Sequence, residues 1–308
     1  MTEHQQYLDE KMHQLRVVCQ AQWDYLTYAN LDKWLNDNFA NDIEGRYYAT
    51  KILLHTVYYT KRDLEKLLHY GLNELIYGEM VKSEMIRKQN IYVPASVTEA
   101  KIEQLKQSTF FVPLLDSKKP SESGNGIIGD LVHKIDISEV QVDFHWNITE
   151  EQLQNYKILV FVDDCIGSGS QLKRFWKSEE ILRIRDICKR HGIIIYYLVL
   201  VGYDANVTKL VNSSQIDGLK IVVCDLLTEK NRVFSDSNII WNKDTNEMQN
   251  AIDYFEKTKK EKGASFLGFK NLDFAVILHD RLPNWSLPIF WKKSNSWAIL
   301  LKRKTSNS

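Results

Sequence analysis

The sequence predicts an α/β protein in which a mostly parallel sheet is flanked by helices and preceded by an α-helical N-terminal region. Two apolar runs, residues 158–162 and 193–201, lack the alternation of a strand with one exposed face, which indicates strands covered on both sides. The residues between them have helical spacing. A strand, a helix and a second strand form the right-handed crossover unit of parallel sheets, so we expect these strands to be parallel.

Size and charge narrow the class of protein. The chain has 308 residues, 44% of them hydrophobic, with 40 Lys and Arg against 40 Asp and Glu. A zero formal net charge argues against a generally basic nucleic-acid coat, although local basic clusters leave nucleic acid open as a partner. The four cysteines lack metal-ligand spacing, and no apolar stretch approaches the roughly 20 residues that cross a bilayer. We expect a folded cytoplasmic protein that does not bind membranes.

Residues 1–90 are expected to form a helical N-terminal region, and residues 91–308 a second domain. Apolar residues recur at helical spacing, as in the group Trp34, Leu35 and Phe39 and the group Ile52, Leu53 and Val57. Asp42 and Thr60 are suitable N-caps at the breaks. This region is either a packing layer or a surface or lid that binds a protein partner.

The second domain is expected to begin with a strand over residues 109–115. Pro113 lies within it and lacks a backbone donor, so the strand should be at an edge of the sheet or pair poorly at that point. A turn-rich segment over 116–126 and a helix over 127–135 follow. Residues 140–146 alternate apolar and polar side chains, which predicts another strand near an edge.

The remaining elements continue the strand and helix alternation. One helix is expected to begin near Ser168 or Ser170 and to end at Gly192, which has the position of a C′ residue. Beyond the strand 193–201, the pattern predicts further elements in this order: a helix over 206–211, a strand over 219–224, a helix over 248–262 and a strand over 274–278.

A cluster of polar residues follows the first apolar run. Asp163 and Asp164 come directly after it, and a loop of glycine and serine leads into the next helix. Carboxyl ends of strands in open α/β sheets are where ligands bind. A loop that exposes backbone N–H groups at the start of a helix attracts anions. Together these features indicate a ligand with both hydroxyl and phosphate groups. The alternative is an ordinary helix-capping turn.

This arrangement of apolar strand, Asp-Asp pair, Gly and hydroxyl loop and helix resembles the ribose-phosphate signature of the type I phosphoribosyltransferases. The loop has serine where that family usually has threonine. The resemblance implies that Asp163 and Asp164 hold the 2′- and 3′-hydroxyls of 5-phosphoribosyl 1-pyrophosphate and take part in Mg²⁺ binding and catalysis. It also implies that the following loop surrounds the 5′-phosphate, with these ligand-binding residues: Cys165, Ile166, Gly167, Ser168, Gly169, Ser170 and Gln171.

The turn-rich segment is similar to the pyrophosphate loop of the same family, by position and composition. The resemblance implies that Lys118 and Lys119 neutralise the leaving pyrophosphate together with Mg²⁺, and the accompanying ligand-binding residues would be Ser121, Ser123 and Gly124. Two lysines in a surface loop can equally be solvated.

Further candidates follow other strands. Tyr203 and Asp204 come after the second apolar run, on the ligand side of the expected sheet, and Asn284 and Trp285 begin a Pro-Asn-Trp-Ser-Leu-Pro segment near the end of the chain. That segment resembles a phosphoribosyltransferase-like branch of bacterial conflict and anti-phage systems. Trp285 could stack on an acceptor base, or belong to the core. For His279 and Arg281 the same two alternatives remain, a role in ligand binding or a structural role.

Two main functions remain. The first is a Mg²⁺-dependent phosphoribosyltransferase-like enzyme that binds 5-phosphoribosyl 1-pyrophosphate or a related ribose phosphate and acts as an effector in anti-phage defence. The second is a catalytically inactive sensor that binds such a nucleotide-like ligand and regulates a protein partner through the N-terminal helices. A third reading, a phosphatase with an aspartate at a strand end, lacks the DxDx(T/V) pattern.

Overall fold

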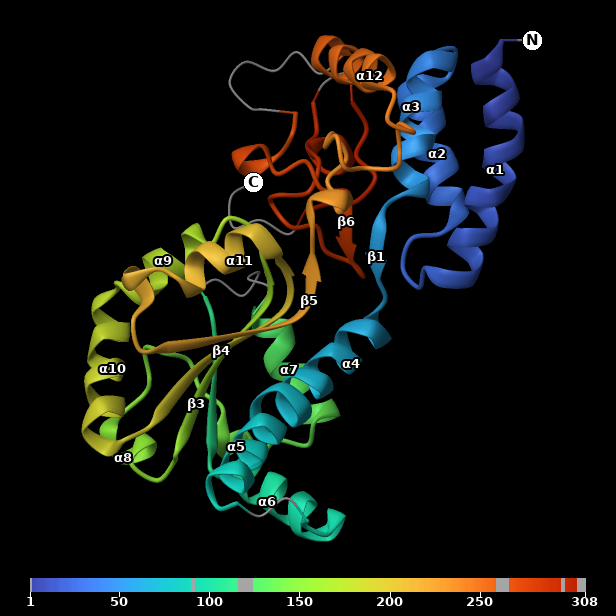
Figure 1. The fold of residues 1–308 in the computed structure, drawn as a ribbon. Coiled ribbons are helices and arrows are strands. Elements are labelled where there is room, and N and C mark those ends of the chain that lie inside the picture. The colour runs from blue at the N-terminus through green and yellow to red at the C-terminus, as the bar shows by residue number, and fades with distance from the viewer. Residues whose placement is uncertain (1, 90–91, 116–123, 259–265, 295–296, 304–308) are drawn as a thin grey trace. The chain divides into compact units, whose positions relative to one another are not determined.

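The computed structural model describes residues 2–89, 92–115, 124–258, 266–294 and 297–303. It divides into two compact units: the first combines the described residues up to Leu64 with those from Leu227 onward, and the second is Glu65–Leu226. The boundary expected near residue 90 lies within the second unit. Figure 1 shows the course of the chain.

The second unit is built on a four-stranded sheet with the order β2-β3-β4-β5. Both β2 with β3 and β3 with β4 pair in parallel. The prediction that β2 lies at an edge is confirmed. The strands are β2 (Thr109–Pro113), β3 (Ile158–Ile166), β4 (Ile194–Tyr203) and β5 (Leu219–Leu227).

Both faces of this sheet are covered, which explains why β3 as far as Val162 and most of β4 are apolar. Leu159 and Phe161 on one face pack in a core with Ile181 and Ile184 of a crossover helix. On the other face, Leu198 lies so close to Gly71 that a Cβ at that glycine would be 2.5 Å from it. The helical elements of this unit are α4 (Lys61–Tyr70, which begins in the first unit), the π-helix Gly71–Gly78, α5 (Glu79–Arg87), α6 (Ala95–Gln107), α7 (Gly124–Lys134), α8 (Glu150–Leu153), α9 (Ser170–Trp176), α10 (Glu179–His191) and α11 (Asp204–Val211).

Two expected elements of this unit differ from the structure. The helix expected to run to Gly192 is two helices, because the Ser178 hydroxyl donates to the Phe175 carbonyl at 2.9 Å and α10 starts anew after Ser178. Gly192 does end α10, with φ +67°. Residues 140–146 do not form a strand: Val142 makes a single bridge to Phe111 and follows a 3₁₀ turn.

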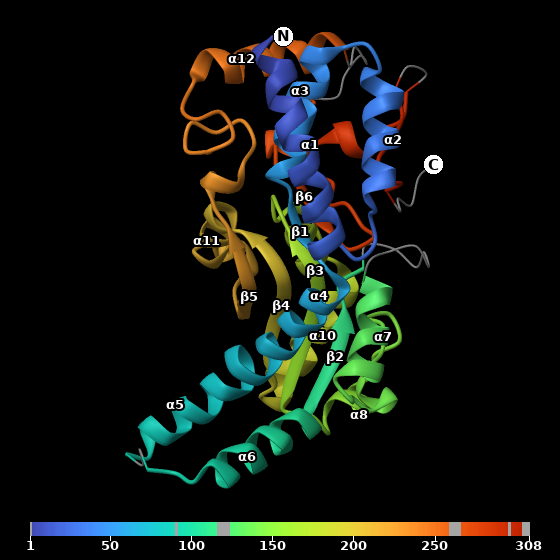
Figure 2. The ribbon, with the colours of Figure 1, turned by 90° about the vertical axis from the view of Figure 1, so that its right-hand side faces the viewer.

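Helices α5 and α6 lie side by side in Figure 2, where they form a hairpin. An ion pair between Lys101 and Glu84 at 3.1 Å joins them. Both partners are partly exposed, and such pairs contribute little to stability. The described helices include none that is long and apolar enough to cross a membrane.

The first unit contains the N-terminal helices, and the prediction of a helical region there is confirmed. Asp42 caps α3 and accepts from the Gly45 amide at 2.9 Å, as predicted. Thr60 likewise accepts from the Asp63 amide at 3.0 Å at the start of α4. The elements of this unit are α1 (Glu3–Gln22), α2 (Tyr28–Phe39), α3 (Ile43–Leu54), β1 (Val57–Tyr59), α12 (Thr245–Thr258) and β6 (Val276–Leu278).

Val57 was expected on a helix, but it opens a strand. β1 pairs in parallel with β6, more than 200 residues later, with Val57 opposite Val276. The helical spacing of Ile52 and Leu53 extends only to Leu54, where α3 ends. The strand expected at 274–278 is therefore present as the shorter β6.

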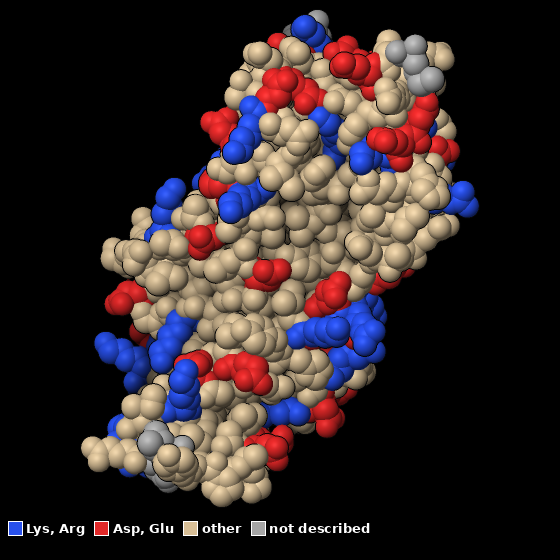
Figure 3. Space-filling model, turned by 45° about the vertical axis from the view of Figure 1, so that its right-hand side comes forward, with Lys and Arg blue, Asp and Glu red and all other residues tan. Residues whose placement is uncertain are grey.

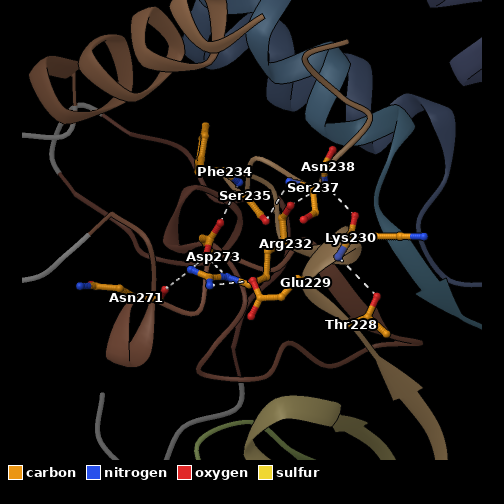
Figure 4. A network of polar contacts seen from close by, with 10 residues as sticks. All are labelled: Thr228, Glu229, Lys230, Arg232, Phe234, Ser235, Ser237, Asn238, Asn271 and Asp273. Atoms are coloured by element: carbon orange, nitrogen blue, oxygen red, sulfur yellow. Dashed lines mark hydrogen bonds and ion pairs between the residues drawn. The ribbon is translucent and has the colours of Figure 1, made fainter. Parts of the chain in front are cut away.

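A buried polar network holds the segment before β6 in place (Figure 4). Asp273 is 1% exposed, accepts from Arg232 Nε at 2.7 Å and accepts from the Phe234 amide at 2.7 Å. Arg232 also donates to the carbonyl of Asn271 at 3.1 Å. Asn238 donates to the Lys230 carbonyl at 3.0 Å. The network therefore joins the loop after β5 to the segment that precedes β6.

Candidate functional site

Asp163 and Asp164 lie within β3 rather than after it, because the strand continues to Ile166. The expected strand ended at Val162. Asp163 is opposite Val199 of β4, and the pairing extends to Ile166 opposite Gly202. The two acids are therefore held in the strand by its pairing with β4, close to the carboxyl end of a central strand, which is where open α/β sheets bind ligands.

Asp163 is almost completely buried and fixed by two hydrogen bonds. It is 4% exposed. The Asp164 amide donates to its Oδ1 at 2.9 Å, and the Tyr197 hydroxyl donates to its Oδ2 at 3.0 Å. Tyr197 is 1% exposed and comes from β4. Side chains alternate along a strand, so Asp163 shares its sheet face with Phe161.

The electrostatics of this pair are unfavourable in the absence of a ligand. Burial raises the pKa of Asp163 well above its ordinary value, and the neighbouring charge of Asp164 raises it further, against the opposing effect of the Tyr197 hydrogen bond. Burial and the charge of Asp163 also raise the pKa of Tyr197 well above its ordinary value, so the phenol stays a donor. Strongly perturbed groups of this kind gather at functional sites.

The loop after β3 turns sharply at Gly169. Gly169 has φ +69° and precedes α9. A Cβ there would be 2.4 Å from Leu210 Cδ1 of α11, so glycine is required both by conformation and by space. The Ser168 hydroxyl lies 3.1 Å from that of Ser170. Because α9 is only seven residues long, the loop amides rather than a long helix dipole would attract an anion.

Helix α11 braces this loop. Asn206 Nδ2 donates to the Gly167 carbonyl at 3.0 Å, and Leu210 packs over Gly169. Asp204 opens α11, and Tyr203, 5% exposed, ends β4. Tyr203 thus lies at the carboxyl end of the strand next to β3, and Asp204 comes directly after it. Because the strands are parallel, this is the end of the sheet at which the two acids lie.

The other predicted residues of the phosphate loop differ in exposure. Cys165 is half-buried and Ile166 is 4% exposed, both within β3. Gly167 is buried, whereas the Gln171 side chain is exposed at the start of α9. A role for Ile166 or Gly167 in ligand binding would therefore use the backbone.

The expected pyrophosphate loop lies largely outside the described residues. Lys118, Lys119, Ser121 and Ser123 all fall there, whereas Gly124 is the first residue of α7. The strand β2, which precedes this segment, runs parallel to β3. The carboxyl end of β2 therefore lies at the same end of the sheet as the two acids.

Asn284 and Trp285 belong to the first unit. Asn284 is exposed. Trp285 is 2% exposed and packs edge-on against Phe274, with ring centroids 5.1 Å apart. This burial gives no support to base stacking by Trp285, and favours the alternative of a core residue. His279, in the same unit, donates from Nδ1 to Asp24 Oδ1 at 3.0 Å and has φ +53°.

Three residues that contribute to the site were not predicted from sequence: Tyr197, Asn206 and Leu210. Tyr197 lies in the apolar run of β4, and a tyrosine in such a run needs a buried hydrogen-bond partner. That signal was present, although it does not identify Asp163 as the partner. Nothing in the local sequence indicates that Asn206 and Leu210 reach back to the loop.

The acids have the chemistry that Mg²⁺ prefers. Carboxylate oxygens are hard donors, and Mg²⁺ is usually held by one or two carboxylates, waters and substrate phosphates. A cation would also relieve the repulsion between Asp163 and Asp164. Within the described ranges, no group of three or more His, Cys, Asp or Glu could hold a metal, so a complete protein cage is not what these residues offer.

Charged side chains are mixed on the molecular face drawn in Figure 3, where Lys and Arg lie among Asp and Glu. This agrees with the balanced composition. Recognition of an anion would therefore depend on local groups, such as the loop amides, rather than on a broad basic surface.

Comparison with known proteins identifies the family of the chain. No curated protein and no solved structure matches the chain. The model of one family, PRTase-CE, matches residues 31–303. This range includes β3, its two acids and the loop that follows, together with most of the first unit. The chain therefore belongs to the PRTase-CE family and is a phosphoribosyltransferase-like protein.

Proposed function

We propose that the protein is a Mg²⁺-dependent enzyme of the phosphoribosyltransferase type that binds 5-phosphoribosyl 1-pyrophosphate. The observation that carries the proposal is the pair of buried carboxylates in β3, followed after Ile166 by a loop in which Gly169 has the left-handed conformation. Hydroxyls of a ribose suit the first group, and the amides of the loop suit a phosphate.

The ribose is held by the two acids. Each carboxylate oxygen accepts hydrogen bonds, and a bond between a hydroxyl and a charged acceptor is stronger than one between neutral groups. The raised pKa of Asp163 means that its charge is poorly stabilised by the protein alone. A ligand hydroxyl that donates to this pair would therefore replace an unfavourable interaction with a favourable one.

The 5′-phosphate is held by the loop from Gly167 to Gln171. Gly169 permits close approach of the backbone, and Asn206 fixes the loop through the Gly167 carbonyl. Mg²⁺, where bound, would be held by oxygens of Asp163 and Asp164 together with the ligand, and would neutralise the pyrophosphate. Lys118 and Lys119 would assist from the neighbouring segment.

In the transfer itself, the bond from C1 of the ribose to pyrophosphate breaks, and a nucleophile, commonly a ring nitrogen, forms a bond to C1. No covalent bond to the protein is needed. The contribution of this chain is to position the ribose and to stabilise the positive charge that develops at C1. Asp163 and Asp164 supply the negative charge for this purpose.

The experiment is the release of pyrophosphate from 5-phosphoribosyl 1-pyrophosphate in the presence of Mg²⁺, with and without candidate bases. We expect release that is lost in the Asp164→Asn variant. Tight binding without release would instead favour the ribose-phosphate sensor, whose output would pass through the N-terminal helices. Absence of both binding and release would contradict either function.

An effector role in anti-phage defence is part of the proposal and rests on the resemblance of residues 283–291 alone. It is tested by plaque counts on bacteria that carry the wild-type gene or the Asp164→Asn variant. Equal counts for both strains would contradict it.

A further inference from the structure

The site contains a buried hydroxyl that the proposed chemistry does not use. Tyr197 is 1% exposed, and its hydroxyl donates to Asp163 Oδ2 at 3.0 Å. The second oxygen of the same carboxylate accepts from the Asp164 amide at 2.9 Å. The carboxylate is thus held at both oxygens, by a neighbouring strand and by its own backbone.

Tyr197 is well placed to control the orientation of this group and poorly placed to touch a ligand. Its partner across the ladder is Phe161, two residues before Asp163, and its ring lies in the core with Phe161 and Val199. A side chain so deeply packed has little freedom to move. It therefore fixes the carboxylate with a single, geometrically defined bond.

Asp163 has no cation among the described residues to take over this task. Its carboxylate accepts the two hydrogen bonds above and lies beside the like-charged Asp164, and no ion pair to Asp163 is present in the described ranges. Without the Tyr197 hydroxyl, Oδ2 of the buried Asp163 carboxylate would lose its hydrogen-bond donor. The carboxylate would then rotate toward another donor.

We propose that Tyr197 is a positioning residue of the ribose site, which acts through Asp163 to hold the carboxylate in the orientation that accepts a sugar hydroxyl. This inference rests on the proposed function and adds a residue to it. It implies that the ribose end and the phosphate end of the site are each positioned by a different hydrogen bond. Tyr197 of β4 serves the ribose end, and Asn206 of α11 serves the phosphate end.

Two ligands separate these roles. Ribose 5-phosphate uses both ends of the site, whereas inorganic phosphate uses only the loop. The ratio of the two affinities therefore reports the contribution of the sugar hydroxyls. A variant that merely destabilises the unit would weaken both ligands together and leave this ratio unchanged.

The variant is Tyr197→Phe, which removes only the hydroxyl. We expect its affinity for ribose 5-phosphate, measured by calorimetry, to fall about three- to tenfold, the loss typical of one hydrogen bond. Its affinity for inorganic phosphate, measured by ³¹P NMR titration, should be unchanged, which also shows that the variant is folded.

Two controls accompany it. Tyr196→Phe removes the hydroxyl of the adjacent, 6% exposed tyrosine, whose side chain points to the opposite face of the strand, and should alter neither affinity. Asn206→Ala should weaken both ligands by a similar factor and so keep their ratio.

The outcomes are distinct. A fall in the affinity for ribose 5-phosphate alone supports the inference. If the wild type binds ribose 5-phosphate but Tyr197→Phe keeps the wild-type ratio, the inference is overturned while the proposed function stands. If the wild type binds neither ligand, the proposed function fails and the inference fails with it.

Discussion

Asp273 and Asp163 are two buried acids in different units of the same chain, and their surroundings differ. Asp273 is 1% exposed, ion-paired with Arg232 and bonded to the Phe234 amide. Asp163 is 4% exposed and lies next to another carboxylate, with a neutral tyrosine as its side-chain donor. Both have a raised pKa, mainly through burial, but at Asp273 the Phe234 amide and Arg232 oppose the shift, whereas at Asp163 the charge of Asp164 adds to it.

We interpret Asp273 as an acid that stabilises the fold, and we propose that Asp163 is an acid that binds a ligand. Disruption of a buried ion pair lowers the free energy of unfolding strongly, because removal of one partner leaves the charge of the other uncompensated. A buried charge next to a like charge is instead held in place by the rest of the fold, and such arrangements mark sites. The following changes test this contrast, from the largest expected effect to the smallest.

The largest effect is expected for Asp273→Asn. The substitution removes the charge that pairs with Arg232, so the free energy of unfolding should fall by about 3 kcal/mol, the low end for a buried ion pair because Arg232 is partly exposed. Chemical denaturation measures this. Asp236→Asn, on the exposed part of the same loop, is the control and should change stability by less than about 0.5 kcal/mol. Equal effects would refute the structural role of Asp273.

Asp163→Asn should behave in the opposite way. It replaces a carboxyl group, whose two oxygens can both accept hydrogen bonds, by an amide with one acceptor oxygen, so affinity for ribose 5-phosphate should fall about ten- to a hundredfold. Calorimetry measures this loss. Stability at neutral pH should be unchanged or higher, because the variant removes the repulsion from Asp164.

The pH dependence of Asp163 has a definite sign. Its pKa in the folded state is raised, so folding favours the protonated form. The stability that this provides is complete below the pKa of the unfolded chain, and is lost as the pH rises through the raised folded value. Thermal unfolding over a pH series should show this loss in the wild type, and a smaller loss in Asp163→Asn. Parallel curves would contradict the prediction.

Gly169→Ala should give the next effect. The positive φ costs about 1 kcal/mol for a residue with a Cβ, and the contact with Leu210 adds to this, so the free energy of unfolding should fall by about 2 kcal/mol. Phosphate affinity should also fall. Gly192→Ala is a matched control, since Gly192 has φ +67° but open space around it. An equal loss of stability in both variants would mean that Leu210 does not restrict the loop.

The smallest effect is expected at Asp24 in the first unit. Burial tends to raise its pKa, but hydrogen bonds from His279, the Lys61 amide and Tyr58 outweigh this and lower it. The resulting stability is present above the unfolded pKa and is lost as the pH falls through the lowered folded value. Asp24→Asn should cost about 1 kcal/mol at neutral pH, measured by denaturation. At a pH below the folded value, the difference between the two proteins should vanish.

The features of the site that could be predicted from sequence are those that depend on neighbouring residues. The apolar run of β3, the two acids after it and the Gly and Ser loop that leads into α9 all follow from local patterns. The extent of β3 beyond Val162 does not, because Asp163 to Ile166 are held in the strand by their pairing with β4. The hydrogen bond between Tyr197 and Asp163 likewise depends on the register of two strands.

The same dependence on distant strand partners explains why some predicted elements of the fold were wrong. Alternation over residues 140–146 predicts a strand, but a strand needs a partner along its length, and only Val142 has one. Instead, Phe144 and Trp146 stack on each other with centroids 4.9 Å apart. The three-residue strand β1 was missed because its partner β6 is more than 200 residues away, and no local pattern identifies such a pairing.

The measurement that tests the central claim most directly is a calorimetric titration of 5-phosphoribosyl 1-pyrophosphate with Mg²⁺ into the wild type and into Asp164→Asn. We predict saturable binding to the wild type with a stoichiometry near one ligand per chain, and a loss of at least tenfold in affinity in the variant. Failure of the wild type to bind, or equal binding by both proteins, would contradict the assignment of these acids to a ribose-phosphate site.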